Sequence, residues 1–175
     1  MQLMKLYEDL FQTSLKMKYH EKLIVNAVIL FMKSKLGFEA KITVKKKDSK
    51  TLIGDVILND NSLNKNKFTL HFTPNQSYPE IIKSLIHELT HSKQISKKEL
   101  KPSDDYKSLI WKNDYTLSVK DYKKTGKNFG DYKKLPWEKE AYANMDKLYS
   151  PFLKSKYWTE LKGKDTNLDF IIDNI

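Results

Sequence analysis

Two histidines and a glutamate near the middle of the chain have the types and the spacing to hold and use a metal ion. The stretch His87-Glu88-Leu89-Thr90-His91 reads His-Glu-x-x-His. On a helix, side chains four residues apart lie one turn apart on the same face, so both imidazoles can reach one ion. Glu88 projects sideways, close enough to bond a water on that ion without being a ligand of the same row. A zinc hydrolase needs this geometry; the alternative is a solvated helix face that carries two histidines.

The composition limits which residues can complete such a site. The chain has no cysteine and four histidines, so metal ligands must come from His, Asp and Glu. A catalytic zinc typically takes three protein ligands and leaves a fourth position for water. The candidates for the third ligand are therefore His20, His71 and the carboxylates.

The chain is strongly basic, with a formal charge of +10, and all 32 of its basic residues are lysine. A basic surface favours acidic partners such as nucleic acid. Lysine lacks the bidentate fork that reads guanine, so sequence-specific DNA recognition is poorly supported. An AT-rich genome would produce the same lysine bias, and we favour that account.

The length of 175 residues predicts one domain, spanning 1–175 with its core in 18–150. Met1 to Leu15 lacks the pattern of a signal peptide, and the apolar run Leu23 to Met32 is too short to span a membrane. We therefore expect a soluble cytoplasmic protein with no membrane partner.

The first half of the chain predicts one helix and a small sheet. A helical pattern runs from His20 to Leu36 and is closed by Gly37. Three strand-like runs follow, which we expect to pair as consecutive antiparallel strands: Phe38 to Lys45, Thr51 to Leu58 and Lys67 to Thr73.

The metal motif lies on the next predicted helix, from Tyr78 to Gln94. Ser77 and Glu80 form a capping-box pattern with Pro79 in the first turn. The motif is therefore placed well inside the helix, away from frayed ends.

The segment 96–135 has little periodicity and is expected to be a long loop with one hairpin, which turns at Asn113-Asp114. Its aromatic residues form either a small satellite core or a wall of a substrate groove, and we favour the core: Tyr106, Trp111, Tyr115, Tyr122, Phe129 and Tyr132. Two helices should follow, from Pro136 to Tyr149 and from Pro151 to Leu161.

The stretch Pro136-Trp137-Glu138-Lys139-Glu140-Ala141-Tyr142-Ala143-Asn144 resembles a second helix of the gluzincin branch of zincin metallopeptidases, which carries a Glu-Ala-x-x-Asp-like pattern. The resemblance implies that Glu140 is the third zinc ligand and that Ala141 lets the helices approach closely. Asn144 stands where the family has an acid and would orient a ligand histidine.

Glu138 is the rival ligand, and it points to a different face of the same helix. Trp137 and Ala141 share the packing stripe that flanks Glu140, which favours Glu140. Asp104 and Asp105 are weaker candidates. The segment from Ile81 to Asn144 also looks like small uncharacterised phage-encoded metallopeptidase-like proteins, which would place the chain in the host cytoplasm or a virion. The resemblance implies an α+β, minimal zincin-like fold.

The resemblance also implies a peptidase mechanism. Zinc would activate a water, and Glu88 would act as the general base that takes its proton. The strand Phe68 to Thr73 would be the sheet edge along which an extended peptide pairs. A donor to the developing oxyanion could be Tyr132, Tyr142 or His71; of these Tyr132 is preferred, although simple packing is the favoured account of Tyr132.

Two other interpretations stay open. In one, a basic nucleic-acid-associated protein carries a zincin scaffold, either as a DNA-bound protease or with zinc in a non-catalytic role. In the other, an inactive zincin scaffold serves in a virion or complex, although retention of Glu88 argues against it because metal binding alone does not need this residue.

Overall fold

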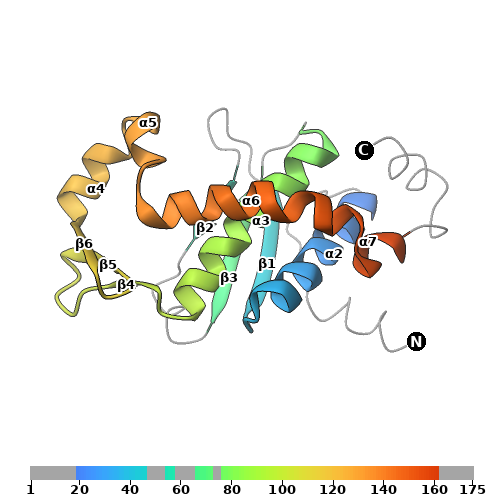
Figure 1. Cartoon of the computed structure of the whole chain (residues 1–175), viewed down its shortest axis with the longest axis horizontal. Coiled ribbons are helices and arrows are strands. Elements are labelled where there is room, and N and C mark those ends of the chain that lie inside the picture. Colours follow the sequence, from blue (N-terminus) through green and yellow to red (C-terminus); the bar gives the residue numbers. More distant parts are fainter. Residues whose placement is uncertain (1–18, 47–53, 58–65, 73–75, 162–175) are drawn as a thin grey trace.

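A computed structural model describes residues 19–46, 54–57, 66–72 and 76–161 of the chain. They form the expected α+β arrangement, with helices and two small three-stranded sheets (Figure 1). In chain order the elements are α2 (Tyr19–Leu36), β1 (Lys41–Lys46), β2 (Gly54–Ile57), β3 (Lys67–Phe72), α3 (Tyr78–Ser96), β4 (Leu100–Pro102), β5 (Ser108–Trp111), β6 (Tyr115–Ser118), α4 (Val119–Thr125), α5 (Phe129–Tyr132), α6 (Pro136–Leu153) and α7 (Lys156–Thr159).

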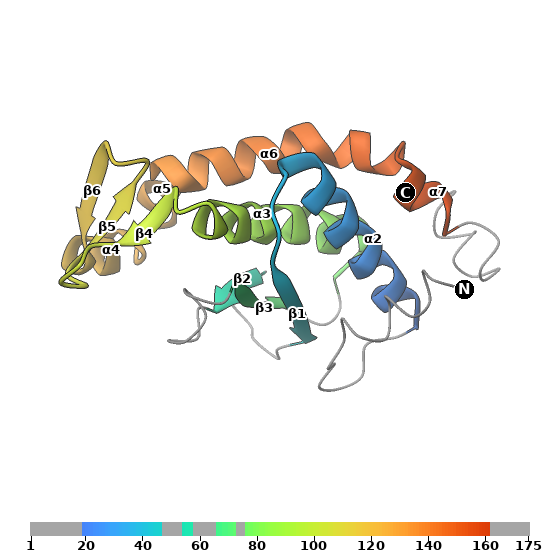
Figure 2. The same ribbon diagram turned by 90° about the horizontal axis from the view of Figure 1, so that it is seen from below.

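Helix α3 is the central element. It lies between α6 on one side and the sheet of β1, β2 and β3 on the other, and it also packs against α2 (Figure 2). Because α3 is covered on several sides, even its polar residues are buried. The hydroxyls of Thr90 and Ser92 are satisfied within the helix by donating to the carbonyl oxygens of Ile86 and Glu88.

The ends of α3 and α2 follow from their sequences. The Ser77 side chain accepts from the Glu80 backbone N–H, while the Glu80 carboxylate accepts from the Ser77 N–H at 2.8 Å, which confirms the capping box. Gly37 closes α2 with a φ of +60°, a left-handed conformation that glycine adopts without strain.

The first sheet has the strand order β1-β3-β2. β2 pairs with β3 antiparallel, but β1 pairs with β3 in parallel, so the prediction of three consecutive antiparallel strands is wrong for β1. The chain does reverse direction from β1 to β2 and again to β3, yet β3 inserts between the first two strands. β3 is therefore the central strand and not the sheet edge that the sequence suggested for peptide pairing.

The main core joins one face of this sheet to α2, α3 and the ends of α6 and α7. The inward residues of the strands alternate with Lys and Thr, as a half-buried sheet requires. The side chains that are almost fully buried here include Ile42, Val44, Phe68, Leu70, Phe31, Ile82, Leu85 and Phe152.

The segment 100–135 is more ordered than a long loop. β4, β5 and β6 form an antiparallel sheet, which includes the predicted hairpin. Its turn lies one residue earlier than expected, with Lys112 and Asn113 both at positive φ. Half of the six aromatic residues, Trp111, Tyr122 and Tyr132, join a satellite core with Leu135 and Trp137, as favoured above. Tyr106, Tyr115 and Phe129 are exposed instead.

Helix α6 is longer than predicted. It continues through Pro151 to Leu153, and only then does the short α7 begin, so the expected break before Pro151 is wrong. α7 ends at Thr159, close to the predicted end at Leu161, and the residues after Leu161 fall outside the described part of the chain. Among the described residues, no helix is long and apolar enough to cross a membrane.

Candidate metal centre

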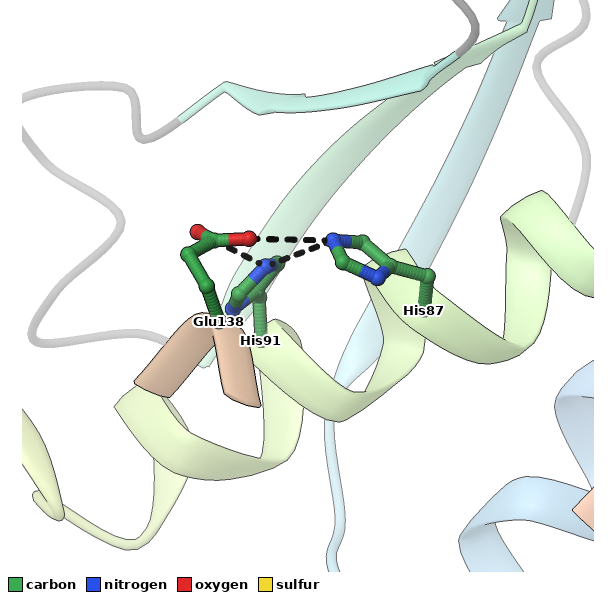
Figure 3. A group of neighbouring side chains, drawn as sticks. All are labelled: His87, His91 and Glu138. Atoms are coloured by element: carbon green, nitrogen blue, oxygen red, sulfur yellow. Dashed lines mark hydrogen bonds and ion pairs between the residues drawn. The ribbon is translucent and has the colours of Figure 1, made fainter. Parts of the chain in front are cut away.

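Three side chains of the kinds that bind metal ions converge between helices α3 and α6. His87 and His91 lie one turn apart on α3, and Glu138 reaches them from the first turn of α6 (Figure 3). The two Nε2 atoms are 3.1 Å apart, and each is 3.3 Å from one oxygen of the Glu138 carboxylate. The three side chains are largely buried, and together they could hold a metal ion.

A glutamine on α3 fixes the orientation of the His91 ring. The Gln94 amide nitrogen donates to the Trp137 carbonyl oxygen at 3.0 Å, so its Oε1 is the atom that faces His91 Nδ1 at 2.8 Å. His91 Nδ1 must therefore carry the proton and donate it. In the neutral ring, Nε2 is then an unprotonated lone pair that points at His87 and Glu138.

The convergence of these atoms calls for a cation. Lone pairs of imidazole nitrogen and carboxylate oxygen repel each other unless a proton or a metal ion lies among them. Among the buried side-chain atoms of the described residues, His87 Nδ1 and Glu138 Oε2 have no hydrogen-bond partner. A buried carboxylate oxygen in that state is suited to a metal ion, because the ion replaces the missing donor.

Without a metal, a proton on His91 takes the place of the cation. Burial by itself lowers the pKa of His91, but the hydrogen bond and charge of Glu138, assisted by Glu88 and Gln94, raise it to about 9. Burial raises the pKa of Glu138, whereas His87, His91 and the Tyr132 hydroxyl outweigh that effect and lower it to about 2. The carboxylate is thus ionised at all ordinary pH values.

The raised pKa of His91 predicts how metal binding depends on pH. Below about pH 9 the metal-free ring holds a proton on Nε2, which the metal must displace, so affinity should fall about tenfold for each pH unit below that value. An NMR titration of the metal-free protein should show the His91 ring titrating near pH 9, and the titration should vanish when metal is added. Titration at the ordinary histidine value would contradict the proposed contact with Glu138.

The structure corrects the choice between the two glutamates of α6. Glu138 lies with the histidines, whereas the Glu140 carboxylate is held by two lysines, at 2.9 Å from Lys93 Nζ and 2.8 Å from Lys112 Nζ. Burial raises the pKa of Glu140, but these two ammonium groups outweigh it and lower the pKa. Glu140 therefore ties α6 to α3 and to the hairpin instead of facing the histidines.

Glu88, the predicted general base, is one of the buried polar residues of α3, and its catalytic role stays a prediction. It is buried on α3 between the two histidines, and its charge raises the pKa values of His91, Tyr132 and Tyr142. The charge of Glu88 therefore acts on the residues of the candidate metal centre.

The tyrosines of the site surround its ligands. Burial, together with the charge and hydrogen bonding of the Glu138 carboxylate, raises the pKa of Tyr132 far above its usual range. Tyr132 therefore stays protonated beside a ligand, and its role as a donor to an oxyanion stays a prediction. The Tyr142 ring meets the His87 ring edge to face, with 4.6 Å between their centroids.

The remaining sequence candidates lie elsewhere. His20 is in the first turn of α2 and His71 is on β3, and neither belongs to the converging group. Asp104 and Asp105 are exposed in the loop before β5. Among the hydrogen bonds of the described residues, Gln94 and not Asn144 orients His91. Gln94 could have been recognised because it follows His91 by three residues and so lies on the same helix face.

Comparison with known proteins gives no further assignment. No family model matches the chain, and no match was found among curated proteins or among solved structures. The function must therefore be argued from the site itself.

Proposed function

We propose that the protein is a zinc-dependent peptidase of the gluzincin type, with His87, His91 and Glu138 as the metal ligands. The observation that carries this proposal is the convergence of two Nε2 atoms and one carboxylate beside a buried Glu88. It combines three protein ligands of the kinds that catalytic zinc uses with an acid–base residue that metal binding alone does not require.

The spacing of the ligand atoms supports zinc as the ion. Two ligands of a tetrahedral zinc, each about 2.0–2.1 Å from the metal, lie about 3.3 Å from each other. The separations of the two Nε2 atoms and the Glu138 oxygens are 3.1–3.3 Å. Nitrogen and carboxylate ligands without thiolate also suit a hydrolytic zinc, whose open position is taken by water.

The chain's own residues divide the chemical work. Zinc bound here would lower the pKa of a water and polarise a peptide carbonyl. Glu88 accepts the proton of the attacking water and delivers it to the leaving amine. Gln94 and Tyr132 hold His91 and Glu138 in place by hydrogen bonds, which preserves the ligand geometry.

Strand β2 provides a route for an extended substrate. β2 is at an edge of the first sheet and contacts α3, and Figure 3 shows it passing over the three ligand side chains. A peptide that pairs with a sheet edge is held in extended form by backbone hydrogen bonds. This assigns to β2 the role that the sequence suggested for β3.

Elemental analysis combined with a cleavage assay tests the proposal. The purified protein should contain one zinc per chain and should cleave unfolded casein. A chelator should remove both the zinc and the activity, and added zinc should restore both. Stoichiometric zinc with no cleavage of casein or of a random peptide pool would reject the peptidase proposal while leaving the metal centre in place.

A further inference from the structure

A lysine beside the metal centre is held between two aromatic rings. Lys133 follows α5, and its Nζ lies 4.3 Å from the centroid of the Phe129 ring and 4.7 Å from that of Tyr142. The residue is nevertheless exposed. Two ring faces fix the position of the ammonium group while leaving it open to an anion from solvent.

Lys133 has no carboxylate partner within the described part of the chain, whereas three other lysines close to the site do. Lys134 pairs with Asp131 at 2.8 Å, while Lys93 and Lys112 both pair with Glu140. Lys134, Lys93 and Lys112 are thus paired with carboxylates, and the charge of Lys133 remains available.

The position of Lys133 connects it to the metal centre. The Tyr142 ring that Lys133 covers is the ring that packs against His87. From these two contacts, the ammonium lies within about 9 Å of the His87 ring, a span that about three residues of extended chain would cover.

The surface around Lys133 is also positively charged. The segment 119–134, which holds α4 and α5, contains six lysines and two aspartates. Lys120, Lys123 and Lys127 are all exposed there. The surface beside the metal centre therefore attracts a negatively charged chain.

We propose that Lys133 selects substrates with an acidic side chain within about three residues of the scissile peptide bond. The inference rests on the proposed peptidase function and specifies its substrate class, an acidic segment of polypeptide. A single-stranded nucleic acid fits less well, because bases stack on open aromatic faces, and the Tyr142 ring is already covered by Lys133 and packed against His87.

Peptide binding to the zinc-loaded full chain tests this inference without relying on catalysis. The probes are two pools of fluorescein-labelled octapeptides of neutral residues, identical except for Glu or Gln at one central position. In the Glu88→Gln background, the Glu pool should bind on the order of tenfold more tightly. Adding Lys133→Met should remove that preference, whereas the matched control Lys134→Met should retain it because Lys134 is already paired with Asp131.

The outcomes separate this inference from the peptidase proposal. Equal binding of the two pools, or equal loss of preference in the two lysine variants, would overturn the role of Lys133. Equal cleavage of the Glu and Gln pools by the wild-type protein would also overturn the role of Lys133, but it would support the peptidase proposal. Absence of cleavage would reject the peptidase, and the binding measurement would then decide on Lys133 alone. Oligothymidylate is a further competitor. If it displaced the peptides, and if Lys133→Met and Lys134→Met weakened its binding equally, the surface would be a general polyanion site and selective recognition by Lys133 would be rejected.

Discussion

Replacing Glu138 with glutamine should abolish stoichiometric zinc binding. Glutamine keeps the size of the side chain but removes the negative charge that faces His87 and His91. Loss of a residue that only supports a ligand typically costs 10–100-fold in metal affinity, so loss of the ligand itself should cost more than about a hundredfold. Zinc content after dialysis and a competition titration with a chromophoric chelator would measure the change.

Glu140→Gln is the matched control for that experiment. The same substitution two residues along α6 breaks the ion pairs with Lys93 and Lys112 but leaves the three ligand atoms in place. Zinc content should stay at one per chain, with at most a modest loss of thermal stability. The assignment fails if Glu138→Gln retains full zinc affinity while Glu140→Gln loses it.

The local structure around the motif could be predicted because short-range chemistry determines it. The Ser77–Glu80 capping box fixes where α3 begins, and the four-residue spacing of the histidines fixes their shared face. Gly37 ends α2 for the same kind of local reason. These features depend on residues within one or two turns of each other.

The third ligand could not be ranked correctly because it depends on how two helices cross. The sequence pattern predicts that the packing stripe of α6, with Trp137 and Ala141, flanks Glu140. In the structure the Trp137 side chain enters the satellite core, and Glu138 in the first turn of α6 lies against α3. Periodicity identifies the faces of a helix, but not which face meets which partner.

The strand order of the first sheet could not be predicted either, because it also depends on long-range packing. Alternating strands and polar linkers predict where the chain reverses, and the reversals do occur between β1, β2 and β3. They do not specify that β3 inserts between the other two strands. The outcome matters for the proposed function because β1 and β2, and not β3, are the edges of this sheet.

Replacing Glu88 with glutamine should abolish peptide hydrolysis while zinc remains bound. Glu88 is buried beside His91 but is not one of the converging ligands. An amide of the same shape cannot accept the proton of the attacking water, and loss of a general base typically costs 10²–10⁴-fold in rate. Initial rates of peptide cleavage, compared at equal zinc content, would measure the loss.

The zinc content and the fold of Glu88→Gln serve as internal controls. Zinc should stay at one per chain, and the circular dichroism spectrum should match that of the wild type, because no ligand changes. The result also separates an active peptidase from an inactive scaffold. An inactive scaffold does not need a general base at this position. If Glu88→Gln cleaved peptides as fast as the wild type, Glu88 would not be the general base, and the measured hydrolysis would come from a contaminating peptidase.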